Sequence, residues 1–292
     1  GDNELTASKT TIKNNTGSEC VTIAYPNCNV PSNRNLLQQT YIGGRICNGQ
    51  VEGKTPRNFY EIGSIICGNT MTSNNSTQGL INHLNTAKSK GGWCVYLIHE
   101  VNNGSGYSPL SADCIAGTLK HINQNDQDFW CCTFAQAIKY IKERDAAKAT
   151  LKSNGGSTLT FSLSDNLDDN IYNYPLSLRY KNPGWSKVSG KQGSKSIEAY
   201  ILNGYIYFDA TPDAGDIVLS GDGASTPEVN PGEQQGGQQQ GSQQQGGQTS
   251  DVLNPCDYKT KLTGGTTIYN QNKTGNTSTG YQYEIWRDKT GG

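Results

Sequence analysis

The sequence predicts a multidomain chain: a partial, distorted (β/α) barrel, then a small all-β sandwich, a disordered linker and a short β-rich end. Three observations predict this order. Up to about residue 151, short apolar runs alternate with stretches of helical periodicity, as in βα units. From residue 156 the apolar residues recur at a period of two, as in half-buried strands. Residues 222–253 are rich in Gly, Ser and Gln and nearly free of apolar side chains.

The barrel-like region is predicted to occupy residues 1–155. Strands are expected at residues 21–25 and 93–98, and the second is the nearly unbroken apolar run of a strand covered on both faces. A third strand is expected at residues 129–132. Helices are expected between and after these strands, with start and stop residues that follow capping preferences: Gly91, Ser111 and Thr133.

The β-sandwich is predicted over residues 156–221. Its best-defined part is a hairpin in which Asn203-Gly204 joins residues 199–202 to residues 205–208, because this dipeptide favours a tight two-residue turn. Such a module either binds sugar or serves as a structural cap. Residues 222–253 cannot bury enough apolar surface to offset the entropy of folding, so they form a linker.

The charge and aromatic composition favour an uncharged partner. The chain has 24 basic and 25 acidic residues without a long run of like charge, so neither nucleic acid nor a membrane is an expected partner. Its aromatic residues are 16 Tyr, 4 Trp and 5 Phe, a balance that suits flat polar ligands such as sugars. We therefore expect a monomer that acts on polysaccharide.

Cysteine usage indicates a secreted, extracellular protein. Eight of the nine cysteines lie within the first 132 residues, which suits disulfide formation in an oxidising compartment. Zinc binding is the competing interpretation, but no paired C-x-x-C motifs occur and the three histidines are scattered. The chain begins at Gly1 without an apolar leader, so we expect that it is a fragment or has lost a signal peptide.

Three segments together resemble the C-terminal half of polysaccharide deacetylases, carbohydrate esterase family 4 (the NodB homology domain). They are residues 91–100 (GGWCVYLIHE), 106–110 (GYSPL) and 129–144, which begin FWCCTF. The resemblance implies a distorted (β/α) barrel that removes acetyl groups from chitin, peptidoglycan or xylan with a divalent metal such as zinc or cobalt.

The resemblance also implies roles for three residues. His99 matches the histidine of the fifth family motif and would be the catalytic general acid, while Leu97 would line the pocket for the acetyl methyl group. Tyr25 lies in the AYP segment that stands at the third motif, where many members carry an arginine, and would contact substrate. An ordinary hydrogen-bonded histidine at a strand end is the alternative for His99. The paired aspartates and histidines that hold the metal in the family are missing from residues 1–20, so no metal ligand is assigned.

Residues 254–292 resemble the opening strands of glycoside hydrolase family 11, the β-jelly-roll endo-1,4-β-xylanases. The similar segments are TTIYNQNKTG and GYQYEIWRD, and the family match implies that Trp286 stacks on a xylose ring. The two catalytic glutamates of that family would come later in the chain. Both resemblances indicate acetylated xylan as the substrate.

A bifunctional deacetylase and xylanase, here truncated and without either complete active site, is therefore the first functional hypothesis. The alternative is a non-catalytic carbohydrate-binding or scaffolding protein built on a degenerate barrel. A separate candidate is the acidic segment with Asp165, Asp168 and Asp169, which could hold calcium or form a solvated turn.

Overall fold

The computed structural model describes residues 1–102 and 105–223, which form two compact units. The described part of unit 1 is residues 1–142, and that of unit 2 is residues 143–223. The division falls inside helix α5 (Phe134–Ala146). The predicted linker beyond residue 223 and the xylanase-like end lie outside the described residues.

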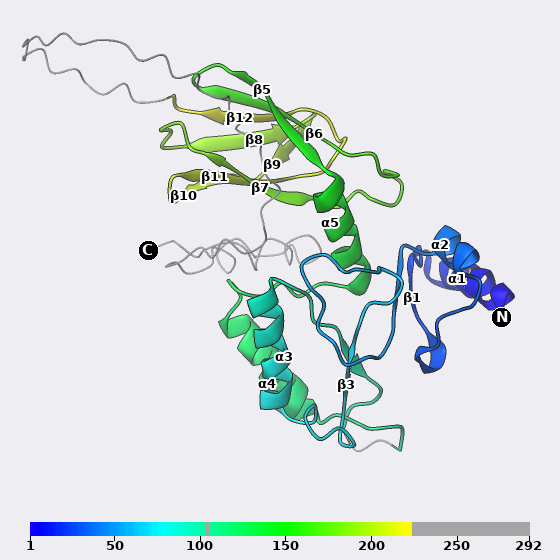
Figure 1. The fold of residues 1–292 in the computed structure, drawn as a ribbon. Coiled ribbons are helices and arrows are strands. Elements are labelled where there is room, and N and C mark those ends of the chain that lie inside the picture. The colour runs from blue at the N-terminus through cyan, green and yellow to red at the C-terminus, as the bar shows by residue number, and fades with distance from the viewer. Residues whose placement is uncertain (103–104, 224–292) are drawn as a thin grey trace, which may run out of the picture. The chain divides into compact units, whose positions relative to one another are not determined.

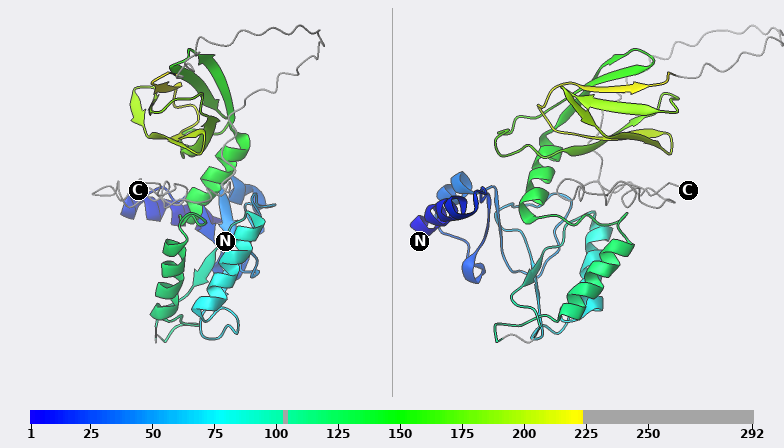
Figure 2. Two further views of the ribbon diagram at one scale, coloured as in Figure 1. Left: turned by 90° about the vertical axis from the view of Figure 1, so that its left-hand side faces the viewer. Right: turned by 180° about the vertical axis from the view of Figure 1, so that it is seen from behind.

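Unit 1 is a mixture of helices and short strands (Figures 1 and 2). Its further helices are α1 (Asp2–Thr16), α2 (Arg34–Thr40), α3 (Thr77–Lys90) and α4 (Ala112–Gln124). Its strands are β1 (Thr22–Ala24), β2 (Gly43–Arg45), β3 (Ile65–Cys67) and β4 (Tyr96–Ile98), and a short 3-10 turn covers Pro26–Cys28. Among the described residues, no helix is both long and apolar enough to span a membrane.

The strands of unit 1 pair in parallel, as the predicted βα units require. β1 pairs with β2 and β3 pairs with β4, and an isolated parallel bridge joins Arg45 of β2 to Ile62, which precedes β3. All of these ladders are open, so the described residues form the α/β arrangement without closing a barrel. The predicted strand at residues 129–132 is wrong, because that segment is irregular and leads directly into α5.

Three helix starts and stops follow the predicted capping residues. The Ser111 side chain accepts a hydrogen bond from the Cys114 amide at the start of α4. Thr133 and Gln136 exchange backbone and side-chain hydrogen bonds at the start of α5, which is a capping box. Gly91 ends α3 in the left-handed conformation (φ 64°), where glycine is favoured.

The N-terminal helix α1 has no counterpart in the sequence prediction. Its residues are mostly polar, and within α1 only Leu5 is buried, so the apolar repeat of an amphipathic helix is missing. Leu5 packs with Tyr25, Leu37 and Tyr41, and the Tyr41 hydroxyl donates to the Leu5 carbonyl at 2.8 Å. Tertiary packing therefore stabilises a helix that its own periodicity does not indicate.

A disulfide joins Cys28 to Cys47, which are 19 residues apart in the sequence, and so closes a loop. Replacing Cys28 with serine should lower the stability of unit 1 by about 3 kcal/mol, because the unfolded chain regains the entropy of that loop. Thermal unfolding measures this change. Cys131→Ser is the matched control, since Cys131 is exposed and free, and should leave the transition unchanged. Equal transitions for Cys28→Ser and the unsubstituted chain would contradict the prediction.

Unit 2 is an all-β sandwich joined to the end of α5 (Figures 1 and 2). The five-stranded sheet has the order β5-β6-β12-β8-β9 and the three-stranded sheet the order β10-β11-β7. The bounds are β5 (Lys148–Asn154), β6 (Thr158–Ser164), β7 (Leu176–Lys181), β8 (Val188–Gln192), β9 (Lys195–Ile197), β10 (Ala199–Leu202), β11 (Tyr205–Ala210) and β12 (Ile217–Gly221).

One apolar core fills the space between the two sheets. Phe161 of β6 and Phe208 of β11 are both fully buried, with ring centroids 6.0 Å apart, and Trp185 closes one end. The predicted hairpin is confirmed: β10 and β11 pair around Asn203-Gly204, and both turn residues have positive φ. β5 pairs with β6, so the strands of this unit begin at residue 148, ahead of the predicted start at 156.

Candidate functional site

The candidate site lies where β4 ends in unit 1. His99 follows β4 directly and its side chain is exposed. The Tyr107 ring meets the imidazole edge-on, with centroids 4.9 Å apart and an interplanar angle of 77°. Tyr107 keeps 59% of its surface exposed, so the two rings form an accessible aromatic pair. Sequence reasoning placed His99 at a strand end but gave Tyr107 no role.

The loop that carries Tyr107 is fixed at both ends. The Gly106 amide donates to the Glu100 carboxylate, and the Leu110 amide donates to the Glu100 carbonyl at 2.8 Å. Ser108 is buried in the left-handed conformation (φ 48°), and its hydroxyl accepts hydrogen bonds from the amide and hydroxyl of Thr70. A non-glycine residue in this conformation stores strain, which is common at functional sites.

Gly68 allows this loop to approach the end of β3. A Cβ added at Gly68 would lie 1.9 Å from the Ser108 carbonyl oxygen, and its φ of 142° also disfavours other residues. The backbone contact thus depends on glycine at this position. It holds the loop against β3, the strand that pairs with β4.

A second polar contact lies beside β3. Asn74 donates to the carbonyl of Ile66 in β3, and its side-chain oxygen lies 2.7 Å from Nε2 of His83. Burial lowers the pKa of His83, which favours the neutral imidazole. The sequence offered no pattern that joins Asn74 to His83, because they meet through the fold of the loop before α3.

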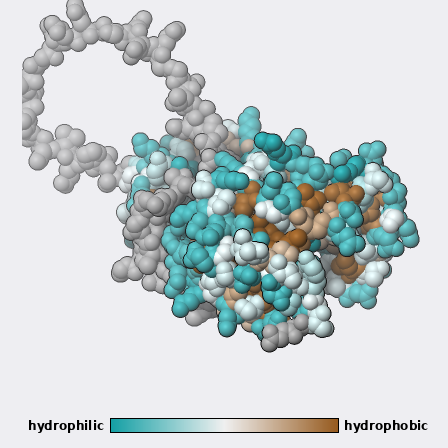
Figure 3. Space-filling view, turned by 60° about the horizontal axis from the view of Figure 1, so that its bottom comes forward, coloured by the Kyte–Doolittle hydropathy of each residue, from teal (hydrophilic) through white to brown (hydrophobic). Residues whose placement is uncertain are grey.

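Hydrophobic residues also reach the surface close to His99 in sequence. Ile98 and Val101 are large exposed side chains on either side of it. Figure 3 shows one face of the molecule, on which hydrophobic residues gather between hydrophilic ones. Exposed apolar and aromatic side chains beside polar groups suit the ring faces and hydroxyl groups of a carbohydrate.

Two of the predicted substrate contacts are buried. Leu97 lies in β4. Tyr25 is 2% exposed, and its hydroxyl donates to the Tyr60 carbonyl at 2.8 Å. Burial raises the pKa of Tyr25 to about 12. Tyr25 follows β1 and His99 follows β4, and these strands belong to two separate ladders. Trp286 lies outside the described residues.

The described residues near His99 do not fit the divalent metal implied by the deacetylase resemblance. In the described part of unit 1, no three His, Cys, Asp or Glu side chains converge as a metal site would require. The chemistry of this edge is therefore derived from the side chains themselves.

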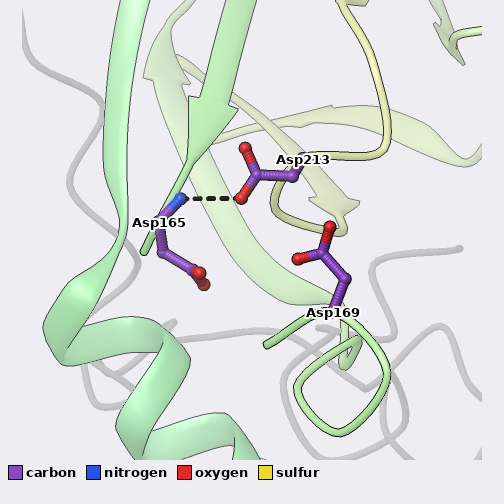
Figure 4. Close-up of side chains that lie close together, drawn as sticks. All are labelled: Asp165, Asp169 and Asp213. Atoms are coloured by element: carbon purple, nitrogen blue, oxygen red, sulfur yellow. Dashed lines mark hydrogen bonds between the residues drawn. The ribbon is translucent and has the colours of Figure 1, made fainter. Parts of the chain in front are cut away.

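Acidic side chains converge in unit 2 instead (Figure 4). Asp165, Asp169 and Asp213 bring carboxylate oxygens within 4.8 Å of one another, and the Asp165 amide donates to Asp213 at 2.9 Å. The sequence groups Asp168 with Asp165 and Asp169. Its carboxylate accepts a hydrogen bond from the Asn170 amide instead. Asp169 and Asp213 are exposed, so a solvated acidic loop accounts for this geometry.

Burial, followed by the charges of Asp213 and Asp169, raises the pKa of Asp165. A raised pKa in the folded state means that ionising this carboxyl costs more free energy in the folded unit than in the unfolded chain. This destabilisation is fully present at neutral pH and disappears as the pH falls below the ordinary range for Asp. Asp165→Asn should therefore raise the unfolding temperature of unit 2 by a few degrees at pH 7. The gain should vanish at acid pH.

Thermal unfolding across pH measures this effect. Asp168→Asn is the matched control, because it removes an exposed charge from the same loop. The prediction fails if both substitutions change the unfolding temperature equally at every pH.

Comparisons with known proteins add two relatives. No protein-family model and no solved structure matches the chain. A gellan lyase from Bacillus sp. is 24% identical over 180 residues, which cover 56% of this chain and 7% of the lyase. Endo-1,4-β-xylanase S20 from Neocallimastix patriciarum is 51% identical over 43 residues, which cover 15% of this chain and 13% of the xylanase.

The chain is distantly related to polysaccharide-degrading enzymes. Both relatives are named as enzymes that act on polysaccharides, and the resemblance of a short segment to a xylanase is confirmed. The chain spans only a small part of each relative's length, and neither relative is named as a deacetylase.

Proposed function

We propose that this chain belongs to a secreted enzyme that degrades plant cell-wall polysaccharide, and that unit 1 is part of the domain that removes acetyl groups from xylan. The observation that carries the proposal is the exposed imidazole of His99 directly after β4, paired edge-on with exposed Tyr107. The Cys28–Cys47 disulfide supports secretion, because such bonds persist in oxidising compartments.

His99 would act as the general acid. Ester hydrolysis adds water to the acyl carbon and breaks the bond between that carbon and the sugar oxygen, which leaves as an alkoxide and needs a proton. An exposed imidazole can supply this proton and regain one from solvent. The Tyr107 ring restricts the imidazole on one side and offers an apolar face to the sugar.

Hydrolysis of the xylan backbone is the second activity in the proposal. It rests on the short similarity to an endo-1,4-β-xylanase. Acetyl groups on xylan block access to the backbone, so an enzyme that removes them and then cuts the chain gains from having both activities in one protein.

The proposal is tested by two product assays on the purified full-length gene product. With acetylated xylan as the substrate, we expect free acetate and new reducing ends. The same xylan after alkaline deacetylation is the matched control and should yield reducing ends alone. A protein that releases no acetate would overturn the esterase assignment, and one that forms no reducing ends would overturn the xylanase assignment. Retention on xylan without either product would favour the non-catalytic alternative.

A further inference from the structure

Three tyrosines share the outer face of the three-stranded sheet in unit 2. Within β11, Ile206, Phe208 and Ala210 point into the core, so the alternate residues Tyr205 and Tyr207 lie on the opposite face. Cross-strand pairing adds Tyr200 of β10 opposite Tyr207. Arg179 and Lys181 of β7 pair with Tyr207 and Tyr205, and Asp209 of β11 lies on the same face by the same alternation. We call Tyr200, Tyr205, Tyr207, Arg179 and Lys181 the tyrosine face.

The rings of this face are arranged as a platform. Tyr200 and Tyr207 stack with centroids 5.4 Å apart and planes 14° from parallel, and Tyr205 lies 6.4 Å from Tyr207. The guanidinium of Arg179 stands 5.0 Å from the Tyr205 ring centroid. Tyr205 keeps 37% of its surface exposed, and Lys181 is exposed beside it.

Sheet stability alone accounts for only part of this arrangement. Cross-strand aromatic pairs do stabilise a sheet, which explains the contact between Tyr200 and Tyr207. It does not explain why the exposed Tyr205 has Arg179 over its ring and Lys181 as its cross-strand neighbour, since a folded core gains little from Lys181. Aromatic rings beside fixed positive charge suit a ligand that has both flat apolar faces and negative charge.

We propose that the tyrosine face binds a linear polysaccharide whose sugar rings carry carboxylates. The pyranose rings would stack on Tyr205 and Tyr207, which bury their apolar C–H surface while the phenol hydroxyls stay hydrated. A carboxylate on a neighbouring sugar would accept hydrogen bonds from Arg179, whose planar guanidinium suits bidentate contact, and be attracted by Lys181. This inference rests on the proposed function in taking polysaccharide as the partner and adds where unit 2 holds it.

The test is affinity electrophoresis of the full chain in gels that contain glucuronoxylan. A matched gel contains the same polymer after its carboxylates have been reduced to alcohols. We expect retardation in glucuronoxylan and weaker retardation in the reduced polymer. Tyr205→Ala and Tyr207→Ala should each weaken binding roughly two- to tenfold in both gels, the change expected for the loss of one aromatic contact.

Arg179→Gln separates the charge contribution from folding. It keeps the tyrosines and should weaken binding to glucuronoxylan while leaving binding to the reduced polymer unchanged. Lys191→Gln is the matched control, because Lys191 is an exposed cation on β8 of the other sheet, and should bind as the unsubstituted chain does. Tyr205→Phe keeps the ring if the alanine variants fail to fold, and it should retain binding to both polymers.

Equal binding by Arg179→Gln and Lys191→Gln in both gels would overturn the carboxylate assignment. Folded tyrosine variants that bind as tightly as the unsubstituted chain would overturn the binding face itself. Failure of the proposed function has a different outcome: acetate release would be absent while retardation remained, because His99 lies in unit 1 and the tyrosine face in unit 2.

Discussion

Replacing His99 with alanine should lower the rate of acetate release from acetylated xylan by roughly 10²- to 10⁴-fold, the usual contribution of a general acid or base. The leaving sugar oxygen would then have to take its proton from water. The exposed position of His99 means that the substitution removes few packing contacts, so the folded state should persist. Initial rates of acetate release, with circular dichroism to verify folding, measure the effect.

His121→Ala is the matched control for that substitution. His121 lies in α4, away in sequence from β4, and the centroid of its ring is 6.0 Å from that of Phe129. Its loss should leave the rate of acetate release unchanged. If His99→Ala retains the full rate of acetate release, His99 is not the acid.

Replacing Trp185 with alanine should lower the free energy of unfolding of unit 2 by about 3–5 kcal/mol, the usual cost of deleting a buried aromatic side chain. Trp185 is 3% exposed and belongs to the sandwich core. Its indole N–H donates to the Gly156 carbonyl at 2.7 Å, so the substitution also removes a hydrogen bond. Hydrogen exchange followed by mass spectrometry measures the loss, because it reports on the peptides of unit 2 separately.

A second substitution tests the same contact from the opposite side. A Cβ at Gly221 would lie 2.0 Å from the indole Cδ2 atom, so Gly221→Ala should displace Trp185 and also reduce protection in unit 2. Peptides of unit 1 serve as the internal control and should exchange as before. Unchanged exchange across β6, β11 and β12 in both variants would show that Trp185 does not stabilise the sandwich.

Local chemistry explains which parts of the fold could be predicted. The caps at Ser111 and Thr133 each need only a hydroxyl three residues before an amide of the first helical turn, and the Asn203-Gly204 turn needs only two residues that tolerate positive φ. Such features are encoded within a few neighbouring residues. The structure confirms them for that reason.

The missed elements depend on contacts between distant residues. The apolar run at residues 129–132 has the composition of a strand, but short apolar runs do not specify one by themselves. Trp130 instead meets Tyr140 of α5 edge-on, with centroids 5.3 Å apart. The expected barrel also rested on a periodicity that does not encode closure, and the described ladders are open.

The candidate site was predicted in part for the same reason. The position of His99 follows from the end of an apolar strand, which a sequence shows directly. The contact with Tyr107 depends on the parallel bridge between Val101 and Leu110, which are not neighbours in sequence. In unit 2, Asp213 joins Asp165 across 48 residues, so the acidic cluster differs from the run of aspartates in the sequence.

The pairing of β5 with β6 determines how this protein can be divided for expression. A recombinant unit 2 that starts at residue 156 would lack β5, and the backbone donors and acceptors of β6 that face it would lose their partners. An uncovered strand of this kind recruits other chains, and the neighbouring Leu159, Phe161 and Leu163 would favour aggregation. A start at residue 143 retains the native edge, where Lys148 and Lys152 of β5 oppose such association.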